Sequence, residues 1–216
     1  SATPLHAVPG STDVASLLER VLPNLDDQST VTPILLARYG EALGIERNDP
    51  EGASTFLAKA ERVATSLNDR VAAMHISAYK VAVKVHHAMY EGMPDRAIEV
   101  WRHARELGNT DVELNMAHLA VVAQVTFGDA DGMRETMRVA LELAPKLRRA
   151  QDVEHLCYTL NSCHALFGDW EQVRSLADRG LRAAAEAPRQ LGVRVFVEHA
   201  TGNTGEGGRW AERLLA

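Results

Sequence analysis

Two short copies of one motif hold the residues best suited to chemistry in this sequence. Phe127-Gly128-Asp129 recurs as Phe167-Gly168-Asp169, forty positions further on. Carboxylates brought together from two turns could bind a metal ion or orient a phosphate. An aspartate after a glycine also marks a helix boundary, because glycine tolerates the left-handed conformation and aspartate caps the next helix. No histidine pair or hydroxyl residue recurs beside either copy, so we favour the capping interpretation.

A glycine-rich stretch at residues 201–208, TGNTGEGG, is the second candidate. The valines at 193, 195 and 197 alternate with other residues, which is a strand pattern. A strand, a glycine-rich loop and a helix could bind a nucleotide on backbone N–H groups. The Walker pattern ends in Gly-Lys-Ser/Thr, however, whereas Arg209 follows Gly208 here. A nucleotide-binding enzyme that uses residues 192–208 is therefore the least favoured hypothesis. Gly202 and Asn203 instead align with Gly168 and Asp169, which favours a helix turn and leaves open whether the segment is helical or extended.

Metal-binding and nucleophile patterns are missing from the rest of the chain. The nine histidines and two cysteines include no C-x-x-C and no His/His pair at i,i+4. There is no G-x-S-x-G nucleophile elbow either. We therefore expect no catalytic residue, no metal and no cofactor in this segment, and no enzymatic activity of its own.

The overall composition excludes several partners. The formal net charge is −6, with 29 acidic and 23 basic residues. Binding a phosphate backbone needs concentrated positive charge, so we expect no direct nucleic-acid binding. No apolar stretch approaches the roughly 20 residues that span a bilayer, and no signal peptide is visible, so we expect no membrane partner. Two cysteines form no disulfide framework, which is typical of a cytoplasmic protein.

Helical periodicity must position these residues, because it runs through nearly all of the chain. Between residues 69 and 91 the apolar side chains advance by threes and fours and predict one buried face: Val71, Met74, Ala78, Val81, Val85 and Met89. Aspartates stand where helices should start, at Asp49, Asp111, Asp129 and Asp169. The pattern predicts an all-α fold of about ten helices joined by short turns.

Small side chains divide these helices into pairs. Triplets at offsets 0, +4 and +7 lie on one helix face, where small residues let a partner helix come close. The triplets are Ala53, Leu57, Ala60; Ala97, Trp101, Ala104; Met133, Met137, Ala140; Val173, Ala177, Gly180; and Gly207, Ala211, Leu214. Helix pairs stacked at intervals of 34 to 44 residues form a solenoid. We predict a right-handed α-solenoid of about five antiparallel hairpins over residues 29–216, preceded in residues 1–28 by the remnant of another hairpin.

The turns and the small-residue faces resemble tetratricopeptide repeats. The matching features are the small residues, a glycine with a polar or acidic neighbour at each turn (FGDADGM, FGDWEQV, TGNTGEG) and Pro145 after a second helix. The spacing varies, and the bulky aromatic residue of the first helix is mostly missing. Such degenerate repeats in an alanine- and arginine-rich chain are similar to the helical-repeat region of large bacterial signalling ATPases, which include LuxR-type transcriptional regulators and ATPase-coupled adenylate cyclases. The resemblance implies a segment that joins a nucleotide-binding module to an output domain, so the full-length protein would carry an ATPase or cyclase domain.

The first helix of each hairpin forms the concave face of a solenoid, which binds extended peptides or other helices. We therefore predict a protein-interaction or ligand-sensing segment of a bacterial signal-transduction or transcription regulator. It would bind a protein, a peptide or a small effector on this face and contact neighbouring domains of the same polypeptide. The alternative is a free-standing tetratricopeptide adaptor protein. The candidate residues for the concave face are Tyr79, His87, Asn115, His118, Gln124, Asn161 and His164.

Overall fold

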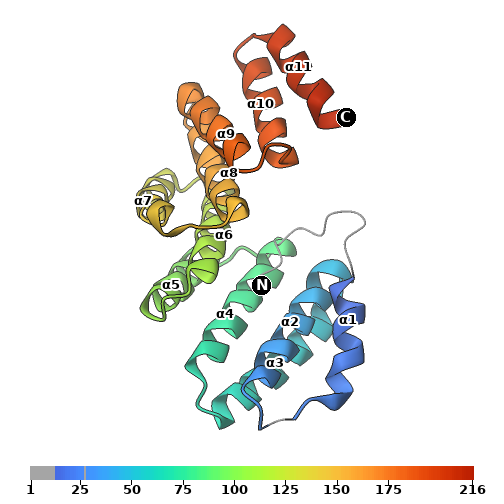
Figure 1. Cartoon of the computed structure of the whole chain (residues 1–216). Coiled ribbons are helices and arrows are strands. Elements are labelled where there is room, and N and C mark those ends of the chain that lie inside the picture. Colours follow the sequence, from blue (N-terminus) through green and yellow to red (C-terminus); the bar gives the residue numbers. More distant parts are fainter. Residues whose placement is uncertain (1–12, 27) are drawn as a thin grey trace. The chain divides into compact units, whose positions relative to one another are not determined.

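The computed structural model describes residues 13–26 and 28–216, and every regular element within them is a helix (Figure 1). The prediction of an all-α fold is confirmed. The α-helices are α1 (Val14–Val21), α2 (Val31–Glu46), α3 (Pro50–Ser66), α4 (Arg70–His86), α5 (Met93–Glu106), α6 (Thr110–Phe127), α7 (Ala130–Leu141), α8 (Ala150–Leu166), α9 (Trp170–Ala183), α10 (Pro188–Ala200) and α11 (Thr204–Leu215). Two short 3₁₀ helices cover Leu22–Asn24 and Ala144–Lys146.

The chain divides into two compact units, residues 1–123 and residues 124–216. The first unit contains α1 to α5 and most of α6, and the second contains the end of α6 and α7 to α11. The remnant predicted for residues 1–28 lies partly outside the described residues, and its described part contains α1.

The first unit is built around α2, α3 and α4, which share one apolar core. Helix α4 packs against both α2 and α3, and the core includes Leu36 from α2, Leu57 from α3 and Ile76 from α4. Two glycines of α2 allow this close packing. A Cβ at Gly40 would lie 3.0 Å from the carbonyl oxygen of Ala53, and a Cβ at Gly44 would lie 2.9 Å from the methyl groups of Val83. Either methyl group would push a neighbouring helix away.

The apolar face predicted for residues 69–91 is only partly buried. The four central side chains of that series are buried, whereas Val71 and Met89 at its ends are 44% and 53% exposed. Val71 lies in the first turn of α4, and Met89 lies beyond the end of that helix. The neighbouring helices therefore cover only the middle of the predicted face.

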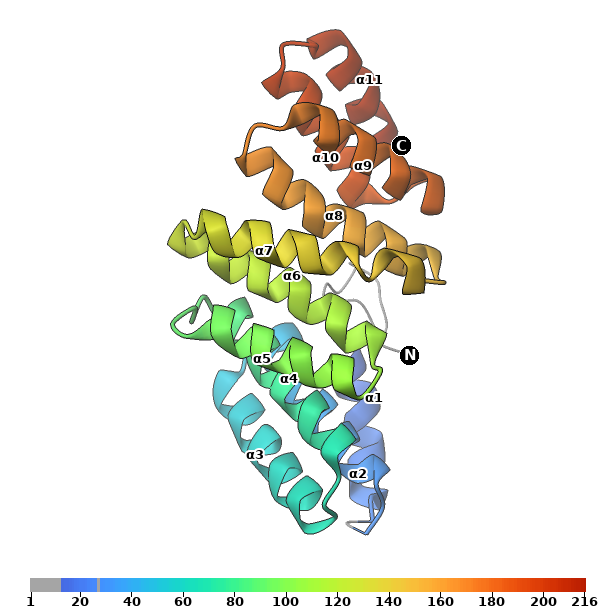
Figure 2. The same cartoon turned by 90° about the vertical axis from the view of Figure 1, so that its left-hand side faces the viewer.

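The second unit pairs α8 with α9 and α10 with α11 (Figure 2). Helix α10 also packs against α8 and α9. The α9 face that meets its neighbours includes Val173, Ala177 and Gly180, and all three are buried. Close approach is obligatory at Gly180, because a Cβ there would lie 2.7 Å from the side chain of Gln190 on α10.

A matched pair of glycine substitutions tests this packing. Gly180→Ala should lower the free energy of unfolding by about 1–3 kcal/mol, because the new methyl group displaces Gln190. Gly208→Ala on α11 should raise it by about 0.5–1 kcal/mol, because the Cβ meets no atom within 4 Å and alanine favours the helix. Chemical denaturation of both variants checks the two signs. Equal stability changes in the two variants would contradict the packing described.

The aspartates of the two Phe-Gly-Asp motifs cap helices, which confirms the capping interpretation. Asp129 accepts a hydrogen bond from the backbone N–H of Gly132 at 2.9 Å, and Asp169 accepts one from that of Gln172 at 3.4 Å. The preceding glycines, Gly128 and Gly168, have φ values of 68° and 71°. Both motifs therefore mark helix boundaries.

One predicted cap is wrong by two residues. Helix α6 already begins at Thr110, so Asp111 lies inside its first turn. The capping side chain is that of Asn109, which accepts a hydrogen bond from the backbone N–H of Val112 at 3.0 Å. Asparagine and aspartate are similarly good caps, so the sequence pattern did not distinguish them.

The strand pattern at 193, 195 and 197 is also wrong, because these residues belong to α10. The buried positions of this helix are spaced by threes and fours: Gln190, Leu191, Arg194, Val197 and Glu198. Gly202, with φ 83°, and the N-terminal neighbour of α11, Asn203, form the following turn. The helix-turn interpretation of this segment is confirmed, and the strand needed for a nucleotide-binding loop is not there.

Candidate functional site

A cavity of about 470 Å³ lies in the first unit, between α2, α4 and α6. These three elements alternate along the chain with α3 and α5. Its lining combines polar and aliphatic side chains from all three: Ile34, Leu35, Arg38 and Glu41 on α2, His75, Ala78, Tyr79 and Ala82 on α4, and Asn109, Asp111, Val112, Asn115 and Met116 in and before α6. Its size falls within the range of small-molecule and peptide side-chain pockets.

The charge of α2 in this cavity is neutralised within the helix. Arg38 forms an ion pair with Glu41, one turn further on, and Glu41 is only 3% exposed. The same guanidinium lies over the ring of Tyr79, 6.0 Å from its centroid. Arg38 therefore connects α2 to α4 and covers one face of the tyrosine.

Two aromatic side chains of α4 line the cavity one turn apart. The rings of His75 and Tyr79 lie 6.1 Å from each other, and His75 Nε2 lies 3.3 Å from the side-chain nitrogen of Asn109. Burial lowers the pKa of His75 and raises the pKa of Tyr79. Both side chains are therefore uncharged at neutral pH. Because the Asn109 amide nitrogen is a donor, His75 Nε2 accepts and its proton is on Nδ1.

The hydroxyl of Tyr79 and the amide of Asn115 are the polar groups available to a ligand. Both side chains line the cavity, and within the part of the chain that the structure describes neither has a hydrogen-bond partner. A hydroxyl and a carboxamide each donate and accept. Together with aliphatic walls, they suit an uncharged group such as an amide.

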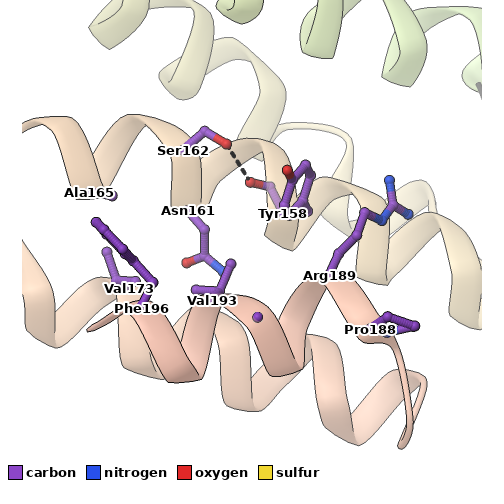
Figure 3. A pocket seen from close by; sticks show the side chains of 10 residues that line it. Tyr158, Asn161, Ser162, Ala165, Val173, Pro188, Arg189, Val193 and Phe196 are labelled. Atoms are coloured by element: carbon purple, nitrogen blue, oxygen red, sulfur yellow. Dashed lines mark hydrogen bonds between the residues drawn. The ribbon is translucent and has the colours of Figure 1, made fainter. Parts of the chain in front are cut away.

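A second pocket, of about 390 Å³, lies in the other unit between α8 and α10 (Figure 3). It is lined by Tyr158, Asn161, Ser162, Ala165, Val173, Pro188, Arg189, Gly192, Val193 and Phe196. The Arg189 guanidinium lies 5.1 Å from the ring centroid of Tyr158, and Trp170 packs edge-on against Phe196 at 6.0 Å. This pocket is thus mostly apolar and aromatic.

Three of the seven side chains predicted for the concave face line these pockets. Tyr79 and Asn115 line the first, and Asn161 lines the second. Arg38, His75 and Asn109 were missed. His75 lies one turn before Tyr79 on the same helix face, so periodicity alone could have identified it.

The other four predicted residues either make contacts within the fold or are buried. His87 contacts the carbonyl oxygen of Gly44 through Nε2 at 2.9 Å, and His164 Nδ1 lies 3.1 Å from the capping carboxylate of Asp169. His118 and Gln124 are 7% and 1% exposed, so neither is available on a surface. His87 is the C-cap of α4, and the other three lie on α6 and α8, which also contribute residues to the pockets.

No cluster of metal-binding side chains was found among residues 13–26 and 28–216: no three His, Cys, Asp or Glu residues are placed to hold an ion. Cys157 and Cys163 are buried free thiols, and burial raises the pKa of Cys163 to about 12. In the described part of the chain, every helix is too short or too polar to cross a membrane.

Comparison with known proteins adds no relative. The chain matches no protein-family model, and no curated protein matches it. The class that the fold and pockets define is therefore an all-helical protein with pockets between its helices.

Proposed function

We propose that this chain is a tetratricopeptide-like helical-repeat segment of a bacterial signal-transduction or transcription regulator. It binds a partner peptide or a small effector on the concave face of a right-handed α-solenoid. Binding shifts how the neighbouring domains of the same polypeptide pack, because the ligand stabilises one arrangement over another.

The observation that carries this proposal is the cavity between α2, α4 and α6. Three first helices contribute to one pocket, as expected where the first helices of stacked hairpins lie side by side. The packing of α4 on both helices of the preceding pair, and of α10 on both α8 and α9, supports the same repeat arrangement.

Apart from the carboxylate of Asp111, the lining is uncharged or internally paired, which supports an amide-bearing ligand. Arg38 is neutralised by Glu41, and His75 and Tyr79 are uncharged at neutral pH. Tyr79 and Asn115 supply hydrogen bonds, while Ile34 and its aliphatic neighbours supply apolar contact. A peptide backbone offers both the amide groups and the side chains that such a pocket needs.

A binding screen with the full chain tests the proposal. The protein is immobilised and probed with a library of N-acetylated, C-amidated tetrapeptides, and the dissociation constants of the selected peptides are measured by calorimetry. Tyr79→Ala or Asn115→Ala should weaken binding about 5–30-fold, which corresponds to one or two lost hydrogen bonds or ring contacts.

Lys84→Ala is the matched control, because Lys84 lies on α4 but is exposed and does not line the cavity. Its peptide affinity should equal that of the wild type. The proposal fails if the library yields no binder, or if the cavity variants bind as tightly as the Lys84 variant.

A further inference from the structure

Buried side chains beside the α8–α10 pocket form a hydrogen-bond network in which the donor and the acceptor of each bond can be assigned. The carboxylate of Glu154 accepts from Nη2 of Arg189 at 2.5 Å and from Nε2 of Gln190 at 3.1 Å. Gln190 Nε2 also donates to the backbone oxygen of Glu154 at 3.0 Å. Because a carboxylate and a carbonyl only accept, the amide nitrogen of Gln190 must face Glu154 and its oxygen must face the other way.

The orientation of the Gln190 amide in turn fixes the orientation of the Asn161 amide. Its side-chain nitrogen donates to Oε1 of Gln190 at 3.1 Å, so its own oxygen points away from the network. Asn161 is 2% exposed, and its Oδ1 is buried without a hydrogen-bond partner. Figure 3 shows the amide directed from α8 toward α10, with the oxygen on the side of Val173 and Phe196. The pocket therefore contains an acceptor that lacks a donor.

The surroundings of this acceptor are uncharged and aromatic. Glu154 neutralises Arg189, whose guanidinium stacks over Tyr158. Phe196 lies on the side to which that oxygen points (Figure 3), and it is 54% exposed, so much of its ring is not enclosed by neighbouring side chains. At Gly192 a Cβ would meet no atom within 4 Å, so the α10 wall has open space.

We propose that this pocket binds the tryptophan side chain of a protein partner, whose indole N–H donates to Asn161 Oδ1. Indole is flat and apolar, and it carries one donor and no acceptor, which matches an unpaired acceptor among apolar walls. Tyrosine, tryptophan and arginine are also the residues that carry most binding energy at protein interfaces, and Tyr158, Arg189 and Trp170 surround the pocket. Because Phe196 is half-exposed, an indole bound in the pocket would remain partly exposed to solvent. This arrangement suits a side chain that the rest of a partner protein holds in place.

The pocket belongs to the second unit, so the inference does not depend on what the α2–α4–α6 cavity binds. Two five-residue peptides provide the test, one with a central tryptophan and one with 3-benzothienylalanine, in which sulfur replaces the indole N–H at nearly the same size. Each is titrated into the ¹⁵N-labelled full chain. The tryptophan peptide should shift the amide signals of residues lining the pocket and bind at least about fivefold more tightly. Equal affinities, or shifts confined to other residues, would overturn the proposal.

Two variants test whether the preference for the tryptophan peptide depends on Asn161 Oδ1. Asn161→Leu should make the two peptides bind equally, whereas Gln172→Leu, which replaces an exposed amide of α9 outside the pocket, should keep the wild-type ratio. If Asn161→Leu does not fold, the affinities of the two peptides for the wild-type protein still test the proposal. Free indole should bind more weakly than the tryptophan peptide. A tighter complex with free indole would assign the pocket to a small molecule and refute the partner side chain.

Discussion

Replacement of Glu198 by alanine is expected to lower the free energy of unfolding by about 3 kcal/mol, since removal of one member of a buried ion pair strands the others. Glu198 is 2% exposed and accepts from Arg174 at 2.9 and 3.1 Å. It also pairs with Arg194 at 3.0 Å and accepts from Asn203 at 3.0 Å. Its loss leaves Arg174 with the hydroxyl of Thr201 and leaves Arg194 with a longer contact, of 3.7 Å, to Asp178. Urea denaturation measures the change.

Glu212→Ala is the control, because Glu212 is exposed on α11 and its loss should change stability by less than about 0.5 kcal/mol.

The hydrogen bonds from Arg174 hold the pKa of Glu198 below its usual value of 4.5. The unfolded chain therefore binds the proton more readily, so this stabilisation is complete above about pH 4.5 and is lost as the pH falls through the lowered pKa. Glu198→Gln should lessen that acid sensitivity. An unchanged acid-unfolding profile would contradict the role given to the carboxylate.

Trp101→Ala should destabilise the first unit by about 3–5 kcal/mol, as the loss of a buried aromatic side chain leaves a cavity. Trp101 is 5% exposed on α5, between Ala97 and Ala104, which are both fully buried. The indole is thus enclosed by a face whose other members are too small to fill the gap. Thermal and urea unfolding measure the loss.

Trp101→Phe separates the contribution of the ring volume of Trp101 from that of its indole N–H. Trp101 Nε1 is buried and, among the described residues, has no hydrogen-bond partner. Phenylalanine keeps most of the ring and removes that unpaired donor, so we expect a loss below about 1.5 kcal/mol. A phenylalanine variant as unstable as the alanine variant would show that ring volume is not what Trp101 contributes.

The helices could be predicted from the sequence because their signals are local. The first triplet members Ala53, Ala97 and Val173 are each fully buried, as the triplet pattern predicts, whereas Leu214 at the end of the last triplet is 38% exposed. Asp129 and Asp169 cap helices because the cap depends on a few adjacent residues. The alternating valines of α10 misled the prediction because three β-branched residues at a spacing of two match a strand, whereas the buried positions include Arg194 and Glu198, which hydropathy treats as exposed.

The pockets could be predicted only in part, because they depend on contacts between distant helices. Tyr79 and Asn115 were identified from their residue types, but the contribution of Arg38 requires α2 to lie against α4. The unpaired oxygen of Asn161 depends on the orientations of Gln190 and Glu154, which lie 29 and 7 positions away in sequence. No local pattern predicts such a network.

The most direct test of the proposed function is to map where a peptide selected by the tetrapeptide screen contacts the chain. Amide signals of the ¹⁵N-labelled protein are followed during titration with that peptide. We predict that the largest shifts fall on residues lining the α2–α4–α6 cavity, including Tyr79 and Asn115, and that Tyr79→Ala removes them. Shifts centred on α3 and α5, with the cavity residues unchanged, would contradict the account.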